Sequence, residues 1–139
     1  MVHYFDEARV QQLLNVPDLL QGVREALVAL TLGQVVQPLR MVMPIGEASA
    51  DGLLFLKPAQ LGDALSTKLI TLVPGNAQKG LPTLLSTIVL MDPATGQTLA
   101  VMEGNTITAM RTAAASAVAA DALVPRTPQV VAMLGSGVL

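Results

Sequence analysis

Apolar residues in the first part of the chain recur every three or four positions, which is typical of helices that bury one face. We expect a short strand over residues 2–5 and a helix that begins at the capping residue Asp6 and ends near Leu14. A second helix opens at Pro17, with Asp18 beside it, and ends at Gly33. The apolar face that this second helix should bury comprises Leu19, Leu20, Val23, Leu27 and Leu30.

After the second helix the pattern changes to short apolar runs separated by Gly, Pro and Asp. Such runs are typical of strands, and Asp92-Pro93 followed by Gly96 predicts a hairpin turn between two of them. A long, alanine-rich helix is expected over residues 105–123, and residues 130–134 predict one further strand. The fold class expected from this pattern is α/β, with helices and a mostly antiparallel or mixed sheet.

The composition narrows the possible partners. Hydrophobic residues make up 52% of the 139 residues and charged residues 13%, which indicates apolar surface covered by a partner or by further chain. The net charge is −2 and the basic residues are scattered, so we expect no nucleic-acid partner. The apolar runs are shorter than the roughly 18 residues of a membrane span. We expect a soluble, cytoplasmic protein with no membrane partner and, since His3 is the sole histidine and cysteine is absent, no metal site.

Two cations interrupt predicted strands. Lys68 lies within "ALSTKLITLV" and Arg40 within "LRMVMPIG", each among mainly apolar neighbours on its face of the strand. Cations in such positions usually have a partner, and together they could hold one ligand carboxylate, bidentate on the arginine and as a point charge on the lysine. Alternatively, each side chain reaches the sheet edge or pairs with an acid such as Asp63 or Glu47.

Arg111 falls in the early turns of the predicted 105–123 helix. Free backbone amides and the helix dipole favour an anion there, so Arg111 could share a bound anion with them. The alternative is an exposed arginine paired with Glu103 or Asp121.

The chain closes with "VVAMLGSGVL". A buried strand followed by Gly135, Ser136 and Gly137 is how a dinucleotide-binding turn begins, because glycines allow the tight turn and the close approach of backbone amides to a pyrophosphate. The same three residues are equally typical of a flexible tail.

The region from about Arg40 onward, and above all "AVMEGNTITAMRTAAASA", resembles the ornithine cyclodeaminase/mu-crystallin family. The resemblance implies an NAD(P)-dependent protein that acts on a small amino or imino acid. It implies that Arg40 and Lys68 bind the substrate carboxylate, with Lys68 also catalytic, and that Arg111 contacts the cofactor phosphates. The other cofactor-binding residues it implies are Thr83, Thr112, Gly135, Ser136 and Gly137.

The resemblance also implies a more specific α/β fold, an α+β substrate/dimerisation domain with a mixed sheet followed by the first strand of a Rossmann domain, and a matching domain division. Residues 1–124 would form a substrate-binding and dimerisation domain, and residues 125–139 the start of a truncated NAD(P)-binding Rossmann domain. Relatives continue for about as long again, so we expect this chain to be a first half that is inactive alone.

Three functions stay open within the family. The favoured one is an oxidoreductase acting on a small cyclic ketimine or an imino or amino acid, with NAD or NADP as cofactor. The alternatives are an ornithine cyclodeaminase, which makes proline and ammonia, and a non-catalytic ligand-binding or dimerisation fragment. Because the family's sheet forms the subunit interface, the expected assembly is a homodimer.

Overall fold

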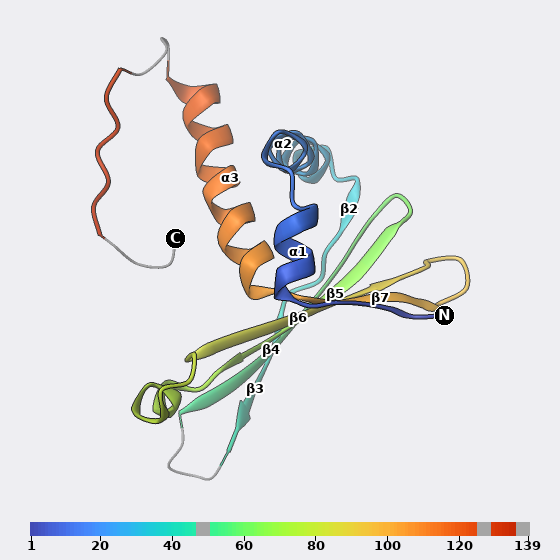
Figure 1. Cartoon of the computed structure of the whole chain (residues 1–139). Helices are drawn as coiled ribbons and strands as arrows, with labels where there is room; N and C mark the ends of the chain where they lie inside the picture. Colours follow the sequence, from blue (N-terminus) through green and yellow to red (C-terminus); the bar gives the residue numbers. More distant parts are fainter. Residues whose placement is uncertain (47–50, 125–128, 136–139) are drawn as a thin grey trace.

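A computed structural model of the chain describes residues 1–46, 51–124 and 129–135 (Figure 1). Its elements, in chain order, are β1 (His3–Phe5), α1 (Glu7–Leu13), α2 (Val16–Thr31), β2 (Val35–Val36), β3 (Met41–Ile45), β4 (Gly52–Leu61), β5 (Ala64–Leu72), the 3-10 helix η1 (Pro74–Lys79), β6 (Leu84–Met91), β7 (Thr98–Glu103) and α3 (Asn105–Leu123).

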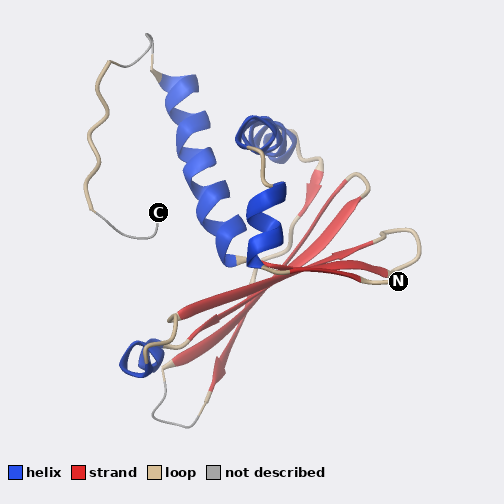
Figure 2. Ribbon diagram, in the orientation of Figure 1, coloured by secondary structure: helices blue, strands red, loops and turns tan. Residues whose placement is uncertain are grey.

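The strands form one seven-stranded mixed sheet in the order β1-β7-β6-β5-β4-β2, with β3 also paired to β4. β1 runs parallel to β7, and the other pairs are antiparallel. The helices α1, α2 and α3 all lie on one face of the sheet, and the end that carries η1 and β3 extends beyond them (Figures 1 and 2). The predicted mixed α/β fold is confirmed.

Local sequence signals account for the helix boundaries. The Asp6 carboxylate accepts a hydrogen bond from the backbone N–H of Arg9, as expected of an N-cap. For α2, however, Asn15 is the cap, because its side chain accepts from the N–H of Asp18 and the helix already begins at Val16. The predicted start at Pro17 is thus one residue late.

The predicted β6–β7 hairpin is confirmed. The Asp92 carboxylate accepts a hydrogen bond of 2.8 Å from the N–H of Ala94, and this closes the turn locally. Gly96 has φ of 73°, a left-handed conformation that glycine adopts without strain.

The core is small and lies between the helices and the strands β6 and β7. Its buried apolar residues, among those described, are Val10, Ala29, Ala100, Ala114 and Val118. Alanines dominate, since short side chains let α2 and α3 approach each other closely.

Two sequence predictions about burial and pairing are wrong. Leu27 and Leu30, placed on the buried face of the second helix, are 43% and 48% exposed because they line an open pocket. Residues 130–134 are extended without strand pairing, and Val130 is 84% exposed, because no described strand lies alongside them. An apolar run forms a strand only where a neighbouring strand accepts its hydrogen bonds.

Over the part of the chain that the structure describes, no helix has the length and apolar character needed to cross a bilayer.

Candidate functional site

Sheet register aligns three cations across neighbouring strands. Lys57 of β4 is directly opposite Lys68 of β5. The β3–β4 register pairs Met41 with Leu56, and extending it by one residue sets Arg40 opposite Lys57. Residues opposite each other in antiparallel strands have Cα atoms about 4.5–5.5 Å apart. Arg40, Lys57 and Lys68 therefore form a continuous row, which we call the cationic row.

The row lies on the face of the sheet that carries the helices. The Lys68 Nζ donates a half-buried hydrogen bond of 2.8 Å to the Thr108 Oγ1 on α3. At the other end, the guanidinium carbon of Arg40 lies 5.7 Å from the ring centroid of Phe55, within the range of a cation–π contact. The row thus starts beneath α3 and runs outward to the open end of the sheet.

The surroundings of Lys68 lower the pKa of its amine. Burial, followed by the charges of Arg111 and Lys57, lowers the pKa of Lys68 from 10.5 to about 8. Each of these causes disfavours the protonated amine. A lysine with this pKa exchanges a proton readily near neutral pH and still carries a positive charge below pH 8.

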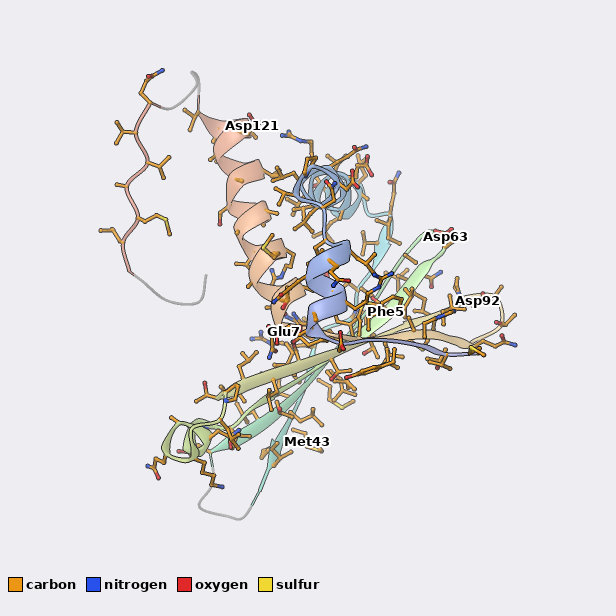
Figure 3. The ribbon with its side chains drawn as sticks, viewed as in Figure 1. Phe5, Glu7, Met43, Asp63, Asp92 and Asp121 are labelled. Atoms are coloured by element: carbon orange, nitrogen blue, oxygen red, sulfur yellow. The ribbon has the colours of Figure 1, made fainter. Side chains whose placement is uncertain are left out.

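Two of the acids that could have neutralised these cations are engaged elsewhere. Asp121 pairs with Arg24, the ion pair found among the described residues. Glu103 accepts from the backbone N–H groups of Asn105 and Thr106, and so caps α3 instead of pairing with Arg111. Asp63 and Asp92 lie at the turns of two hairpins (Figure 3). Glu47 lies outside the described residues.

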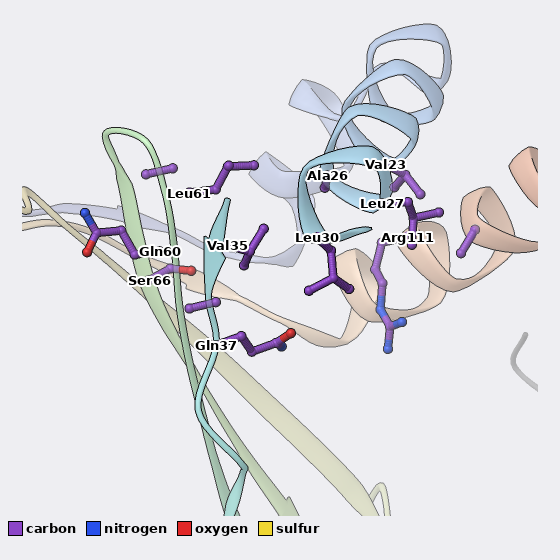
Figure 4. A pocket seen from close by; sticks show the side chains of 13 residues that line it. Val23, Ala26, Leu27, Leu30, Val35, Gln37, Gln60, Leu61, Ser66 and Arg111 are labelled. Carbon is purple, nitrogen blue, oxygen red and sulfur yellow. The ribbon is translucent and has the colours of Figure 1, made fainter. Parts of the chain in front are cut away.

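A pocket of about 440 Å³ lies beside Arg111, between α2, α3 and one edge of the sheet (Figure 4). Leucines and alanines form most of its wall, and its polar contributors are Gln37, Gln60, Ser66 and Arg111. Ser66 is two residues before Lys68 on the same face of β5, so the pocket adjoins the cationic row.

A close helix–strand contact fixes the start of α3. The N–H of Gly104 donates to the Ser86 carbonyl over 2.9 Å, and the Ser86 Oγ donates to the Asn105 Oδ1 over 2.9 Å. A Cβ on Gly104 would lie 2.6 Å from the Ser86 Oγ and 3.0 Å from its carbonyl carbon. Glycine is needed here for space, and this contact determines where Thr108 meets Lys68.

The structure describes three of the remaining predicted site residues, namely Thr83, Thr112 and Gly135. Thr83 is exposed just before β6, five residues from the Lys68 partner Ile88, or about 17 Å along the strand. The Thr112 hydroxyl donates to the carbonyl of Thr108 over 2.7 Å. Gly135 is exposed and has φ of 103°. Ser136 and Gly137 lie outside the described residues.

Sequence reasoning missed two members of the site. Lys57 lies inside the apolar run "GLLFLKPAQL", which predicts a strand. A lysine is as unusual in this apolar strand as Lys68 is in its own, so the same reasoning could have identified Lys57. Thr108 carried no such signal, because only the packing of α3 on β5 brings it to Lys68.

Comparison with known proteins identifies the family of the chain. The sequence profile of the ornithine cyclodeaminase/mu-crystallin family matches residues 2–139. Mouse ketimine reductase mu-crystallin is 44% identical over 108 residues, which cover 76% of this chain and 34% of the relative. The resemblance to the family that the sequence predicted is confirmed.

Solved structures share the fold. Thermococcus litoralis Delta(1)-pyrroline-2-carboxylate reductase, in complex with NADH and L-proline, aligns with a TM-score of 0.78 and 37% identity over 86% of this chain and 37% of that one. An archaeal alanine dehydrogenase dimer with bound NAD aligns with a TM-score of 0.79 and 31% identity over 86% and 36%. The chain spans only about a third to two fifths of the length of the curated relatives it matches, for example 42% of a Burkholderia ambifaria Delta(1)-pyrroline-2-carboxylate reductase and 34% of mouse mu-crystallin.

Proposed function

The chain belongs to the ornithine cyclodeaminase/mu-crystallin family, and we propose that it forms the substrate-binding part of an NAD(P)-dependent reductase of small cyclic ketimines or imino acids. The observation that carries this proposal is the cationic row, which presents Arg40 and Lys68 on one face with no described acid to neutralise them. Relatives named as reductases of ketimines and of pyrroline-2-carboxylate support the reductase over the cyclodeaminase.

In this proposal the substrate carboxylate lies over the row. The Arg40 guanidinium, held against Phe55, offers two parallel N–H groups, and the Lys68 ammonium adds a point charge. Thr108 keeps the Lys68 amine in place through its hydroxyl. With a pKa of about 8, Lys68 also holds a proton beside the imine nitrogen, which must gain one when hydride adds to the adjacent carbon.

A bound nicotinamide dinucleotide would supply the hydride. Arg111 fits such a group, because it is exposed, lies in an early turn of α3 and is without an acid partner among the described residues. We further propose that Thr83, Thr112, Gly135, Ser136 and Gly137 line the cofactor site. Residues 1–124 would act as the substrate and dimerisation domain, and residues 125–139 would begin the cofactor domain, with either NAD or NADP as cofactor.

The test is the substitution Lys68→Met in the native protein that contains this chain, assayed by oxidation of NADH or NADPH with Delta(1)-pyrroline-2-carboxylate. Loss of the charge and of the proton should lower kcat/KM by about 100-fold. The control Lys79→Met alters an exposed lysine of η1 and should leave kcat/KM unchanged. Unchanged turnover in Lys68→Met would refute the assigned role, and release of ammonia from ornithine would favour the cyclodeaminase.

We also propose a homodimer formed through the face of the sheet opposite the helices. Side chains that alternate with the cationic row along the strands make this face largely apolar, and they include Leu54, Leu56, Leu65, Leu69, Val89 and Val101. The helices of the described chain leave it uncovered (Figure 2). An apolar face of this extent is typical of a subunit interface.

A further inference from the structure

We infer that Lys57 is a third binding group for the substrate carboxylate, placed between Arg40 and Lys68 in the cationic row. The inference rests on the proposed function, because it adds a binding residue to that same site. The juxtaposition that carries it is the register of three strands, which sets Lys57 directly opposite Lys68 on one side and next to Arg40 on the other.

The position of Lys57 puts its side chain beneath any carboxylate that the two ends of the row share. Neighbouring strands stand about 4.8 Å apart, so a group that contacts both Arg40 and Lys68 has to bridge two strand spacings and lies above the middle strand. The Arg40 guanidinium already leans over this strand, 5.7 Å from the ring of Phe55, which is two residues before Lys57 on the same face. The flexible four-carbon stem of Lys57 lets its ammonium reach the carboxylate from below.

Lys57 differs from Lys68 in having no protein counter-charge or anchoring helix contact to satisfy. The Thr108 hydroxyl donates to the carbonyl of Gly104, so it accepts the hydrogen bond from Lys68 and draws that amine toward α3. Within the described residues, Lys57 forms no ion pair. A half-buried cation without a counter-charge is costly, and a bound carboxylate would supply the missing negative charge.

The pairing of two lysines across the strands favours the same conclusion. Like charges directly opposite each other in antiparallel strands destabilise the sheet. Lys57 and Lys68 are both half-buried, so solvent screens their repulsion less than at a fully exposed site. The charge of Lys57 is one of the causes that lower the pKa of Lys68, which places the two amines within Coulombic range. A carboxylate held between them would offset this repulsion.

Lys57 also separates carboxylate binding from proton transfer. In the proposed reduction, Lys68 gives its proton to the imine nitrogen and becomes neutral, so it then holds the carboxylate only weakly. Arg40 and Lys57 take no part in this transfer and keep two positive charges on the carboxylate. Loss of Lys57 should therefore weaken binding more than it slows the chemical step.

The experiment measures competitive inhibition of the native protein that contains this chain by two planar substrate analogues. Pyrrole-2-carboxylate carries the negative charge, whereas pyrrole-2-carboxamide has nearly the same shape and is neutral. Lys57→Gln should raise the inhibition constant of the carboxylate about tenfold and change that of the carboxamide by less than about twofold. With Delta(1)-pyrroline-2-carboxylate as the substrate, KM should rise about tenfold while kcat stays within about twofold.

Two control variants accompany Lys57→Gln. Lys57→Arg keeps the charge and should keep the inhibition constants within about threefold of the native values. Lys79→Gln alters an exposed lysine of η1 and should change neither constant. An unchanged inhibition constant for the carboxylate in Lys57→Gln, or equal weakening of both analogues, would overturn the inference.

Failure of the proposed function is distinguishable from failure of this inference. If the native protein reduces no imine, the proposed function fails, and calorimetry of the two analogues then tests Lys57 by the same comparison. A preference for the carboxylate that falls about tenfold in Lys57→Gln supports the inference, and equal affinities for the two analogues in the native protein refute it.

Discussion

Replacing Gly104 by alanine tests whether the contact between α3 and β6 sets the geometry of the site. Gly104 has φ of −107° and ψ of −11°, which alanine adopts without strain, so the backbone conformation adds no penalty. The cost comes from space alone, because the new Cβ would meet the Ser86 Oγ at 2.6 Å and the Ser86 carbonyl carbon at 3.0 Å. Either the serine hydroxyl turns away from Asn105 or α3 shifts outward.

The magnitude follows from these two responses. Overpacking of this kind costs about 1–3 kcal/mol, and loss of the hydrogen bond from Ser86 to Asn105 adds about 1 kcal/mol. We expect Gly104→Ala to lower the free energy of unfolding by about 2–4 kcal/mol. With a urea m-value of about 2 kcal/mol/M, the denaturation midpoint should fall by about 1–2 M.

Gly22→Ala is the matched control. Gly22 lies inside α2, and a Cβ there meets nothing within 4 Å. The same substitution should therefore raise the free energy of unfolding by about 0.5–1 kcal/mol through helix propensity. Urea unfolding of the two variants, followed by circular dichroism, gives shifts of opposite sign if the reasoning is correct. A midpoint for Gly104→Ala equal to or above that of the unaltered protein would refute it.

Two further predictions concern Lys68 and the sheet. Anion binding favours the protonated Lys68, so affinity for a carboxylate should fall as the pH rises through about 8. Lys57→Gln removes a like charge and should therefore move this inflection to higher pH. KM measured from pH 6 to 10 checks both expectations, and a flat pH profile contradicts them. Leu69→Glu places a charge in the proposed apolar interface and should convert the dimer to monomers, whereas Leu69→Met should leave it intact. Light scattering measures the mass of each species. A native protein that is monomeric at micromolar concentration would contradict the proposed interface.

Much of the fold could be predicted from the sequence because local signals agreed with the packing. The helix 105–123 was predicted with its observed bounds, and the hairpin at Asp92 formed as its turn residues indicate. The errors arose where tertiary context decides. Leu27 and Leu30 of α2 have helical spacing but line an open pocket, and residues 130–134 have strand composition without a paired neighbour among the described residues.

The candidate site was only partly predictable. Alternation along a strand correctly set Lys68 on the same face as Ser66, but it says nothing about which strand lies alongside. The pairing of β4 with β5 is what brings Lys57 to Lys68, and the β3–β4 register is what aligns Arg40 with both. Strand register depends on turn lengths and on the packing of the whole sheet, so no single stretch of sequence contains it.

The parallel pairing of β1 with β7 has a consequence for how the chain folds. His3 of β1 pairs with Ala100 of β7, so the first strand has no partner until nearly the whole sheet has been synthesised. The hairpins from β4 to β7 involve short chain separations and can form early, whereas the β1–β7 contact closes a loop of about a hundred residues. During synthesis the N-terminal segment must therefore wait in an unpaired state, and its docking onto the sheet edge should be among the last steps of folding.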